Sequence, residues 1–173
     1  MIRRTVVLMI GAVSLIVCAA ALAESSADIK VPFPEGYRQW TFLHGTILPA
    51  NSGTFGKKPC EKPCTGGIMY FYGNDKAMEG FRNGKFPEGS IIADELLETH
   101  GNDSGNAMEG PRRGVGVMVK DSQRYASTGG WGYASFAGGN PVDENTEAEK
   151  KACYNCHVPR KDHDYVFTQY QAR

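Results

Sequence analysis

Five short stretches of the chain combine apolar side chains with turn-rich borders, as strands do. In residues 39–48 the side chains alternate with a period of two, so that Trp40, Phe42 and His44 point to one face. Residues 66–73 form an apolar and aromatic run between glycines, which predicts a well-buried strand. The remaining stretches of this kind are 89–98, 113–120 and 129–136. The pattern therefore predicts five strands.

Helix signals are fewer. Asn74 is a suitable N-cap, and Gly84 is a suitable C-terminal stop. Ala77, Met78 and Phe81 lie between them at the spacing of one helical face. This segment is therefore expected to be a short helix.

A second helix is expected near the C-terminus, where Asn145 or Thr146 provides a capping side chain. Two glutamates follow in its first turn and two lysines come after them, as the helix dipole favours. Residues 99–112, in contrast, are polar and glycine-rich, and we expect a mobile loop there. Overall, a mostly β domain with a few short helices is predicted.

The N-terminus has the pattern of a secretory signal. Arg3 and Arg4 form a basic head, residues 5–20 are apolar and uncharged, and small residues end the segment at Ala23. The apolar run is too short to be convincing as a membrane span. We therefore expect a signal peptide over residues 1–23, cleaved near Ala23, and export to the periplasm.

A lipoprotein lipidated at Cys18 is the rival interpretation of this segment. Val17, just before it, is larger than lipoprotein processing usually accepts. We therefore expect the mature chain, residues 24–173, to form one domain that is not anchored to a membrane.

The charge of the mature chain argues against two classes of partner. Loss of Arg3 and Arg4 leaves 17 of the 19 basic side chains, against 19 acidic ones. No basic stripe or Lys/Arg run is present, so nucleic acid is not expected to bind. The amphipathic and apolar patterns of a membrane-binding surface are also missing after residue 23.

The most reactive cluster lies close to the C-terminus, where Cys153, Cys156 and His157 have the spacing C-x-x-C-H. On a helical turn these three positions share one face. That arrangement suits haem c, because each thiol can add to one vinyl group while the histidine nitrogen reaches the iron from the proximal side. We therefore predict one covalently bound haem c with His157 as the proximal iron ligand.

Two other functions of the same spacing remain as alternatives. A zinc site needs a second pair of ligands, which Cys60 and Cys64 could supply. A thioredoxin-like redox pair belongs near the start of a helix in a βαβ unit, not at a chain end. For Cys60 and Cys64 themselves, the oxidising compartment favours a local disulfide. Its effect on stability should be small, because the loop it closes is very short.

The distal side of the iron is predicted to be open or weakly occupied. His44 is the one other histidine that we would test as a sixth ligand, since His163 is too close in sequence to His157 to reach the opposite face. The four methionines of the mature chain all precede His157, whereas in small helical electron-transfer cytochromes the methionine follows the haem motif.

Two C-terminal stretches, STGGWGY (127–133) and CYNCHVPRKDHDYVFT (153–168), resemble the cytochrome P-460 family, which includes the cytochromes c′-beta. The resemblance extends over residues 37–170 and includes YRQW, YGNDKA and FPEGSIIA. It implies a mostly antiparallel β fold of the α+β class with haem c held against the sheet. It also implies His157 as proximal ligand, thioether bonds from Cys153 and Cys156, and a homodimer.

The same resemblance implies chemistry on small nitrogen species. Some members oxidise hydroxylamine, whereas the c′-beta members bind nitric oxide on five-coordinate iron in an apolar pocket. A soluble redox partner such as cytochrome c is expected. In the hydroxylamine-oxidising members a lysine is bonded covalently to the porphyrin edge. No lysine occurs between Phe86 and Val119, and the other candidate lysines stand in polar segments typical of solvated charges.

Pocket residues are predicted from their strand positions. Phe71 is a candidate for the distal face, with an ordinary core position as the alternative. Trp131 and Tyr133 point the same way on their strand and are expected to pack against the porphyrin. Glu95, on an otherwise apolar strand face, is the candidate proton acceptor with a raised pKa, and a water-facing edge residue is the alternative.

The leading functional hypothesis is a periplasmic mono-haem cytochrome with an open distal site, which binds or oxidises hydroxylamine or nitric oxide. If the protein oxidises hydroxylamine, it is a haem oxidoreductase; the sequence leaves open whether it is an enzyme. The alternatives are a simple electron-transfer cytochrome with a protein sixth ligand, and a nitric oxide-binding module without turnover.

Overall fold

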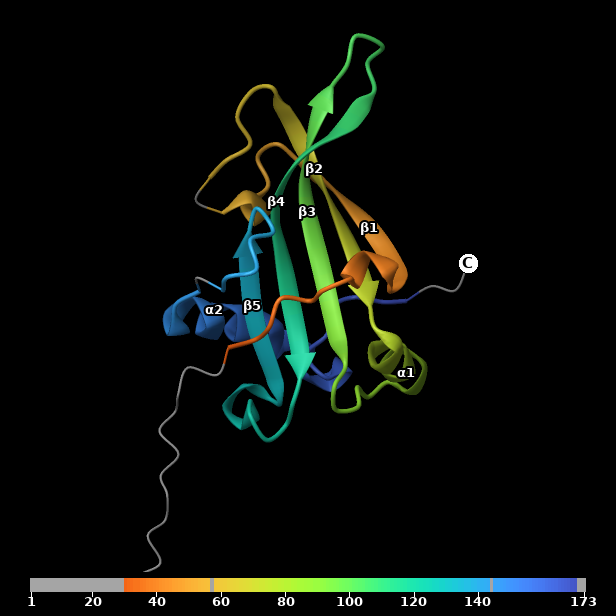
Figure 1. The fold of residues 1–173 in the computed structure, drawn as a ribbon, viewed down its shortest axis with the longest axis vertical. Coiled ribbons are helices and arrows are strands. Elements are labelled where there is room, and N and C mark those ends of the chain that lie inside the picture. Colours follow the sequence, from red (N-terminus) through yellow and green to blue (C-terminus); the bar gives the residue numbers. More distant parts are fainter. Residues whose placement is uncertain (1–29, 57, 144, 171–173) are drawn as a thin grey trace, which may run out of the picture.

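The computed structural model describes residues 30–56, 58–143 and 145–170, and its centre is an antiparallel sheet of five strands (Figure 1). Each strand pairs with the next one along the chain. The strands are β1 (Thr41–Pro49), β2 (Cys64–Gly73), β3 (Ile91–Gly101), β4 (Ala107–Lys120) and β5 (Trp131–Ala137). The predicted strands and the α+β class are therefore confirmed. The predicted signal peptide, residues 1–23, lies outside the described residues.

Two α-helices of the described residues begin directly after the residues that carry the predicted N-capping signals. The Asn74 side chain accepts a hydrogen bond from the backbone of Ala77 at the start of α1 (Asp75–Asn83). Thr146 forms a capping box with Glu149 at the start of α2 (Glu147–His157). The described part of the chain also contains four short 3-10 helices: η1 (Tyr37–Gln39), η2 (Gly53–Phe55), η3 (Ala126–Thr128) and η4 (Val158–His163).

The prediction of a mobile loop over residues 99–112 is wrong. β3 and β4 continue as a long hairpin that projects beyond the rest of the sheet (Figure 1), and its turn occupies only the residues between Gly101 and Ala107. The side chain of Asn102 closes this turn by accepting from the backbone of Ser104 and Asn106. Cross-strand backbone hydrogen bonds do not require apolar side chains, so a polar sequence can still form strands there.

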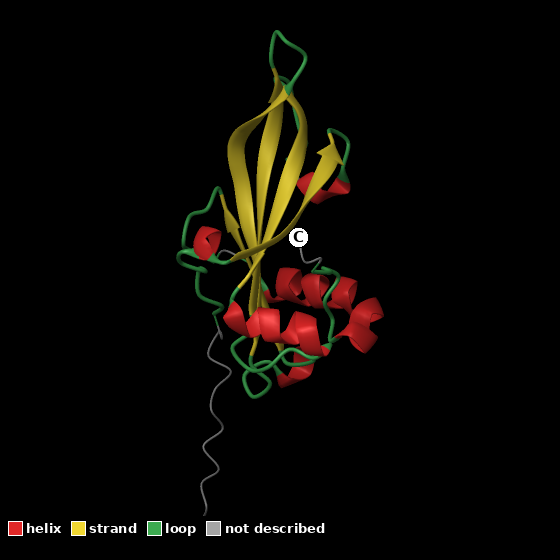
Figure 2. Cartoon of the chain, turned by 90° about the vertical axis from the view of Figure 1, so that its right-hand side faces the viewer, coloured by secondary structure: helices red, strands yellow, loops and turns green. Residues whose placement is uncertain are grey.

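The two sheet faces are covered by different segments. The helices α1, α2 and η4 lie on one side, here called the helix face (Figure 2), and the N-terminal segment with η1 crosses the other, here called the opposite face (Figure 1). Buried residues of the helix-face core are Leu43, Ala77, Met78, Phe86, Ile92, Trp131, Tyr133, Tyr165 and Val166. Those of the opposite-face core are Val31, Tyr37, Ala93, Val115, Val117, Tyr125, Ala134 and Phe136.

Consecutive strand residues, such as Ile92 and Ala93, point to different faces. The side chains that α2 directs toward the sheet therefore contact only alternate residues of each strand. Among the described residues, no helix combines the length and the apolar character needed to cross a membrane.

Candidate haem site

The end of α2 brings the three residues of the C-x-x-C-H motif together on the helix face. Both cysteines are free thiols; Cys153 is half-buried against the helix-face core, and Cys156 is exposed. His157 is the last residue of α2, and its ring centroid lies 5.1 Å from that of Tyr133 on β5. The helix thus presents two thiols and an imidazole beside the sheet.

Hydrogen bonding determines which nitrogen of His157 is available to a metal. Nδ1 lies 2.7 Å from the carbonyl oxygen of Tyr165, which can only accept. Nδ1 therefore carries the hydrogen, and Nε2 keeps its lone pair. Burial lowers the pKa of His157, although the bond to Tyr165 opposes this shift. The imidazole is consequently neutral near pH 7, as metal ligation requires.

These residues fit haem c. Cys153 and Cys156 are three residues apart on one helix and remain unpaired, so both can form thioether bonds. His157 follows directly with Nε2 uncommitted, so it can supply the proximal ligand. Cys60 and Cys64 are joined to each other in a disulfide, as the sequence predicted, and are therefore not available as zinc ligands.

Phe71 of β2 lies on the helix face, half-buried against its core. The ring of His44 stacks on it with a centroid distance of 4.4 Å and an interplanar angle of 24°. The strict alternation predicted for β1 is wrong here, because the pairing with β2 shifts between Phe42 and His44. This irregularity places His44 on the same face as Leu43, and Phe42 contacts Tyr70 instead.

Asp94 is the carboxylate that the sequence interpretation missed. It pairs with Phe71 across the β2–β3 ladder. Burial is the main cause that raises the pKa of the Cys153 thiol, and the charges of Cys156 and Asp94 contribute to the same shift. Its carboxylate lies over Gly116 of β4, where a Cβ atom would come within 2.2 Å of Oδ2. Burial raises the pKa of Asp94 to about 6. A titratable group thus lies close to Cys153 of the C-x-x-C-H motif.

Glu95, the predicted proton acceptor, points to the opposite face. It is only 1% exposed, and Arg38 donates to its carboxylate from Nε at 3.0 Å and from Nη2 at 2.5 Å. Arg112 adds a third contact at 3.4 Å. Burial by itself would raise the pKa of Glu95, but the hydrogen bonds and charges of Arg38, Tyr37 and Arg112 lower it below its usual value. Both the raised pKa and the water-facing alternative are therefore wrong.

We expect Glu95→Gln to lower the free energy of unfolding at pH 7 by about 1–2 kcal/mol, because charge-assisted hydrogen bonds are lost. The value is modest because Arg38 is itself 59% exposed. A lowered pKa stabilises the fold above the usual glutamate range, and this contribution is lost as the pH falls through the folded-state pKa. Urea unfolding at several pH values should therefore show the two proteins converging in acid. Equal stability at pH 7 would contradict the assignment.

Trp131 does not provide a surface for a porphyrin, which corrects a second prediction. It is fully buried, and its ring lies 5.6 Å from that of Phe86 and 5.1 Å from the Lys120 ammonium nitrogen. Its Nε1 donates to Asp164 at 3.3 Å. Tyr133, further along β5, is also buried, and its ring contact with His157 places it beside the predicted proximal ligand.

Comparison with known proteins agrees with this geometry. The model of a family described as Cytochrome P460 matches residues 34–168, which include every strand, both α-helices and the C-x-x-C-H motif. A search of curated proteins found no match to the chain.

Proposed function

Because the chain belongs to the cytochrome P460 family, we propose that it is an exported mono-haem c-type cytochrome that binds or oxidises hydroxylamine or nitric oxide at an open distal iron site. One observation carries the proposal: at the end of α2, His157 keeps Nε2 free beside two unpaired thiols. When bound, haem supplies the redox chemistry and the coordination position for a small nitrogen compound.

The protein itself would hold the haem, enclose it on the helix face and accept protons from the substrate. Cys153 and Cys156 would hold the haem through thioether bonds, and His157 would supply a ligand to its iron. Phe71 contributes an apolar surface. Hydroxylamine must lose protons when it is oxidised, and the Asp94 carboxylate, ionised at neutral pH, can accept one. This assigns to Asp94 the role that strand pattern alone assigned to Glu95.

An electron carrier with a protein sixth ligand is the second candidate, and one observation favours it. His44 stacks on Phe71 and so lies on the helix face with the attachment cysteines. His100, in contrast, lies far along the β3–β4 hairpin, where its Nε2 is 3.2 Å from Glu98. His44 and His100 therefore provide a matched pair for a test.

We expect the purified, haem-loaded protein to have a high-spin ferric absorption spectrum that neither His44→Ala nor His100→Ala changes, because the distal position has no protein ligand. A low-spin wild-type spectrum that becomes high-spin only in His44→Ala would instead establish the electron carrier. Turnover of hydroxylamine with an electron acceptor then separates an oxidase from a protein that only binds nitric oxide.

The proposal includes the surroundings of the protein. The N-terminal pattern over residues 1–23 supports export to the periplasm, and the Cys60–Cys64 disulfide is typical of an oxidising compartment. The family resemblance supports a homodimer and a soluble redox partner such as cytochrome c.

A further inference from the structure

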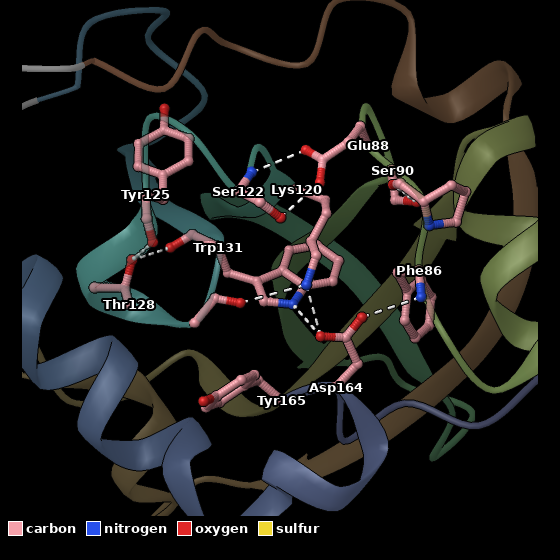
Figure 3. Close-up of polar contacts among 12 residues, drawn as sticks. Phe86, Glu88, Ser90, Lys120, Ser122, Tyr125, Thr128, Trp131, Asp164 and Tyr165 are labelled. Carbon is pink, nitrogen blue, oxygen red and sulfur yellow. Dashed lines mark hydrogen bonds and ion pairs between the residues drawn. The ribbon is translucent and has the colours of Figure 1, made fainter.

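A buried ion pair fastens the C-terminal segment to the sheet (Figure 3). Lys120, the last residue of β4, donates from Nζ to Asp164 Oδ1 at 2.6 Å, and the two side chains are only 8% and 13% exposed. Asp164 also accepts from Trp131 Nε1 at 3.3 Å and from the backbone nitrogen of Phe86 at 3.0 Å. Lys120 donates a second bond to the carbonyl of Gly129 at 3.3 Å. Both charges are thus hydrogen-bonded, as buried ions require.

Asp164 of this ion pair directly precedes Tyr165 in the sequence, and the carbonyl oxygen of Tyr165 accepts the hydrogen bond from His157. Asp164 and Tyr165 both have left-handed backbone conformations, with φ values of 52° and 64°. Such conformations are costly for non-glycine residues and persist only where the surroundings impose them. The turn directs the Tyr165 nitrogen to the Arg160 carbonyl at 2.8 Å and the Tyr165 carbonyl to His157 Nδ1 at 2.7 Å.

We propose that the Lys120–Asp164 ion pair is a positioning device for the axial histidine. It sets the direction of the Tyr165 carbonyl, and thereby the strength with which His157 Nε2 donates to the haem iron. The inference rests on the proposed function in one respect, namely that His157 binds that iron. Outer-shell partners of a metal-binding histidine fix its ring orientation and raise its basicity. Here the outer-shell partners of His157 are the Tyr165 carbonyl and, behind it, the charged side chains of Asp164 and Lys120.

Apolar packing alone would keep this segment on the sheet. Tyr165 and Val166 are 8% and 3% exposed and belong to the helix-face core. Such contacts have little directional preference. The hydrogen bonds of Asp164, in contrast, come from β4, β5 and the segment before β3, so they restrain both the position and the rotation of the turn.

Loosening of this turn is expected to raise the reduction potential. When the Tyr165 carbonyl is less well held, its hydrogen bond to His157 Nδ1 weakens and Nε2 becomes a poorer donor. Ferric iron depends on that donation more than ferrous iron does, so the reduction potential rises. The iron–histidine bond also weakens, which lowers its stretching frequency in the ferrous protein.

The test compares the haem-loaded Asp164→Asn and Lys120→Met variants with the wild type. Asparagine tolerates the left-handed conformation, so the first change removes charge without opposing the turn. Both variants are expected to raise the ferrous-to-ferric ratio at a fixed poise about tenfold, the lower end of outer-shell effects. This corresponds to about 59 mV for a one-electron couple. Resonance Raman spectra should show a lower iron–histidine frequency in both.

Asp164→Asn removes a negative charge and Lys120→Met removes a positive one, so the pair of variants distinguishes positioning from a direct effect of charge. If the two residues acted only through their charges, Asp164→Asn would raise the potential and Lys120→Met would lower it, and that outcome overturns the proposal. If Lys120→Met does not yield folded protein, the Lys120→Met/Asp164→Asn double variant replaces it. The double variant leaves no unpaired charge, so positioning predicts a raised potential and net charge predicts none.

The control is Glu95→Gln, which weakens the ion pairs of another buried carboxylate, on the opposite face. It should lower stability without moving the potential or the iron–histidine frequency. Wild-type protein that binds haem, with Asp164→Asn and Lys120→Met potentials unchanged, would overturn the positioning role alone. Wild-type protein without haem would overturn the proposed function itself, so the two failures are distinguishable.

Discussion

We expect the Cys153→Ala/Cys156→Ala variant to lose all covalently bound haem. The two thioether bonds are the only covalent attachment predicted, and both thiols are unpaired at the end of α2. Haem held only by His157 dissociates on denaturation. The haem stain of a denaturing gel should therefore disappear, and the intact mass of the protein should fall to that of the unmodified chain.

The matched control changes the other cysteine pair. Cys60 and Cys64 form their disulfide at the start of β2, away from α2, so the Cys60→Ala/Cys64→Ala variant should keep its haem stain. A stain retained after removal of Cys153 and Cys156, or lost only after removal of Cys60 and Cys64, would show that the attachment site is elsewhere.

Asp94→Asn is expected to slow hydroxylamine oxidation by about a hundredfold or more, the usual effect of removing a general base. Because burial raises the pKa of Asp94 to about 6, its carboxylate becomes the main form as the pH rises through that value. The wild-type rate should therefore climb around pH 6 and level off above it. The variant should lack this rise, which steady-state kinetics between pH 5 and 8 would reveal.

Loss of stability would not explain that result. Because the pKa of Asp94 is higher in the folded than in the unfolded protein, Asp94 stabilises the fold at pH values below its unfolded-state pKa. This contribution is lost as the pH rises through about 6. The Asp94→Asn change introduces an uncharged amide, so the variant should be at least as stable as the wild type at pH 7. Glu95→Gln, one residue away on the opposite face, should keep the wild-type rate and pH profile. Wild-type kinetics in Asp94→Asn would remove Asp94 from the mechanism.

Local signals were sufficient for the caps of the two α-helices and for the grouping of the C-x-x-C-H residues. Asn74 and Gly84 cap α1 as predicted, and Thr146, one of the two predicted candidates, caps α2, because a cap involves residues only a few positions apart. The spacing of Cys153, Cys156 and His157 also determines by itself that they share one side of α2. The prediction failed where pairing between strands decides the outcome, as in the hairpin over residues 99–112 and at the irregularity beside His44.

By itself, the sequence determined the number and approximate position of the strands and the two α-helices, and that two thiols and an imidazole lie together. It also implied that Asp94 and Glu95 point to opposite faces, since strand side chains alternate. Only the tertiary structure decided which carboxylate faces the C-x-x-C-H motif, because that depends on the face on which α2 packs, some fifty residues later. The same holds for Lys120 and Asp164: their charges are 44 positions apart and meet only because the C-terminal turn returns to the end of β4.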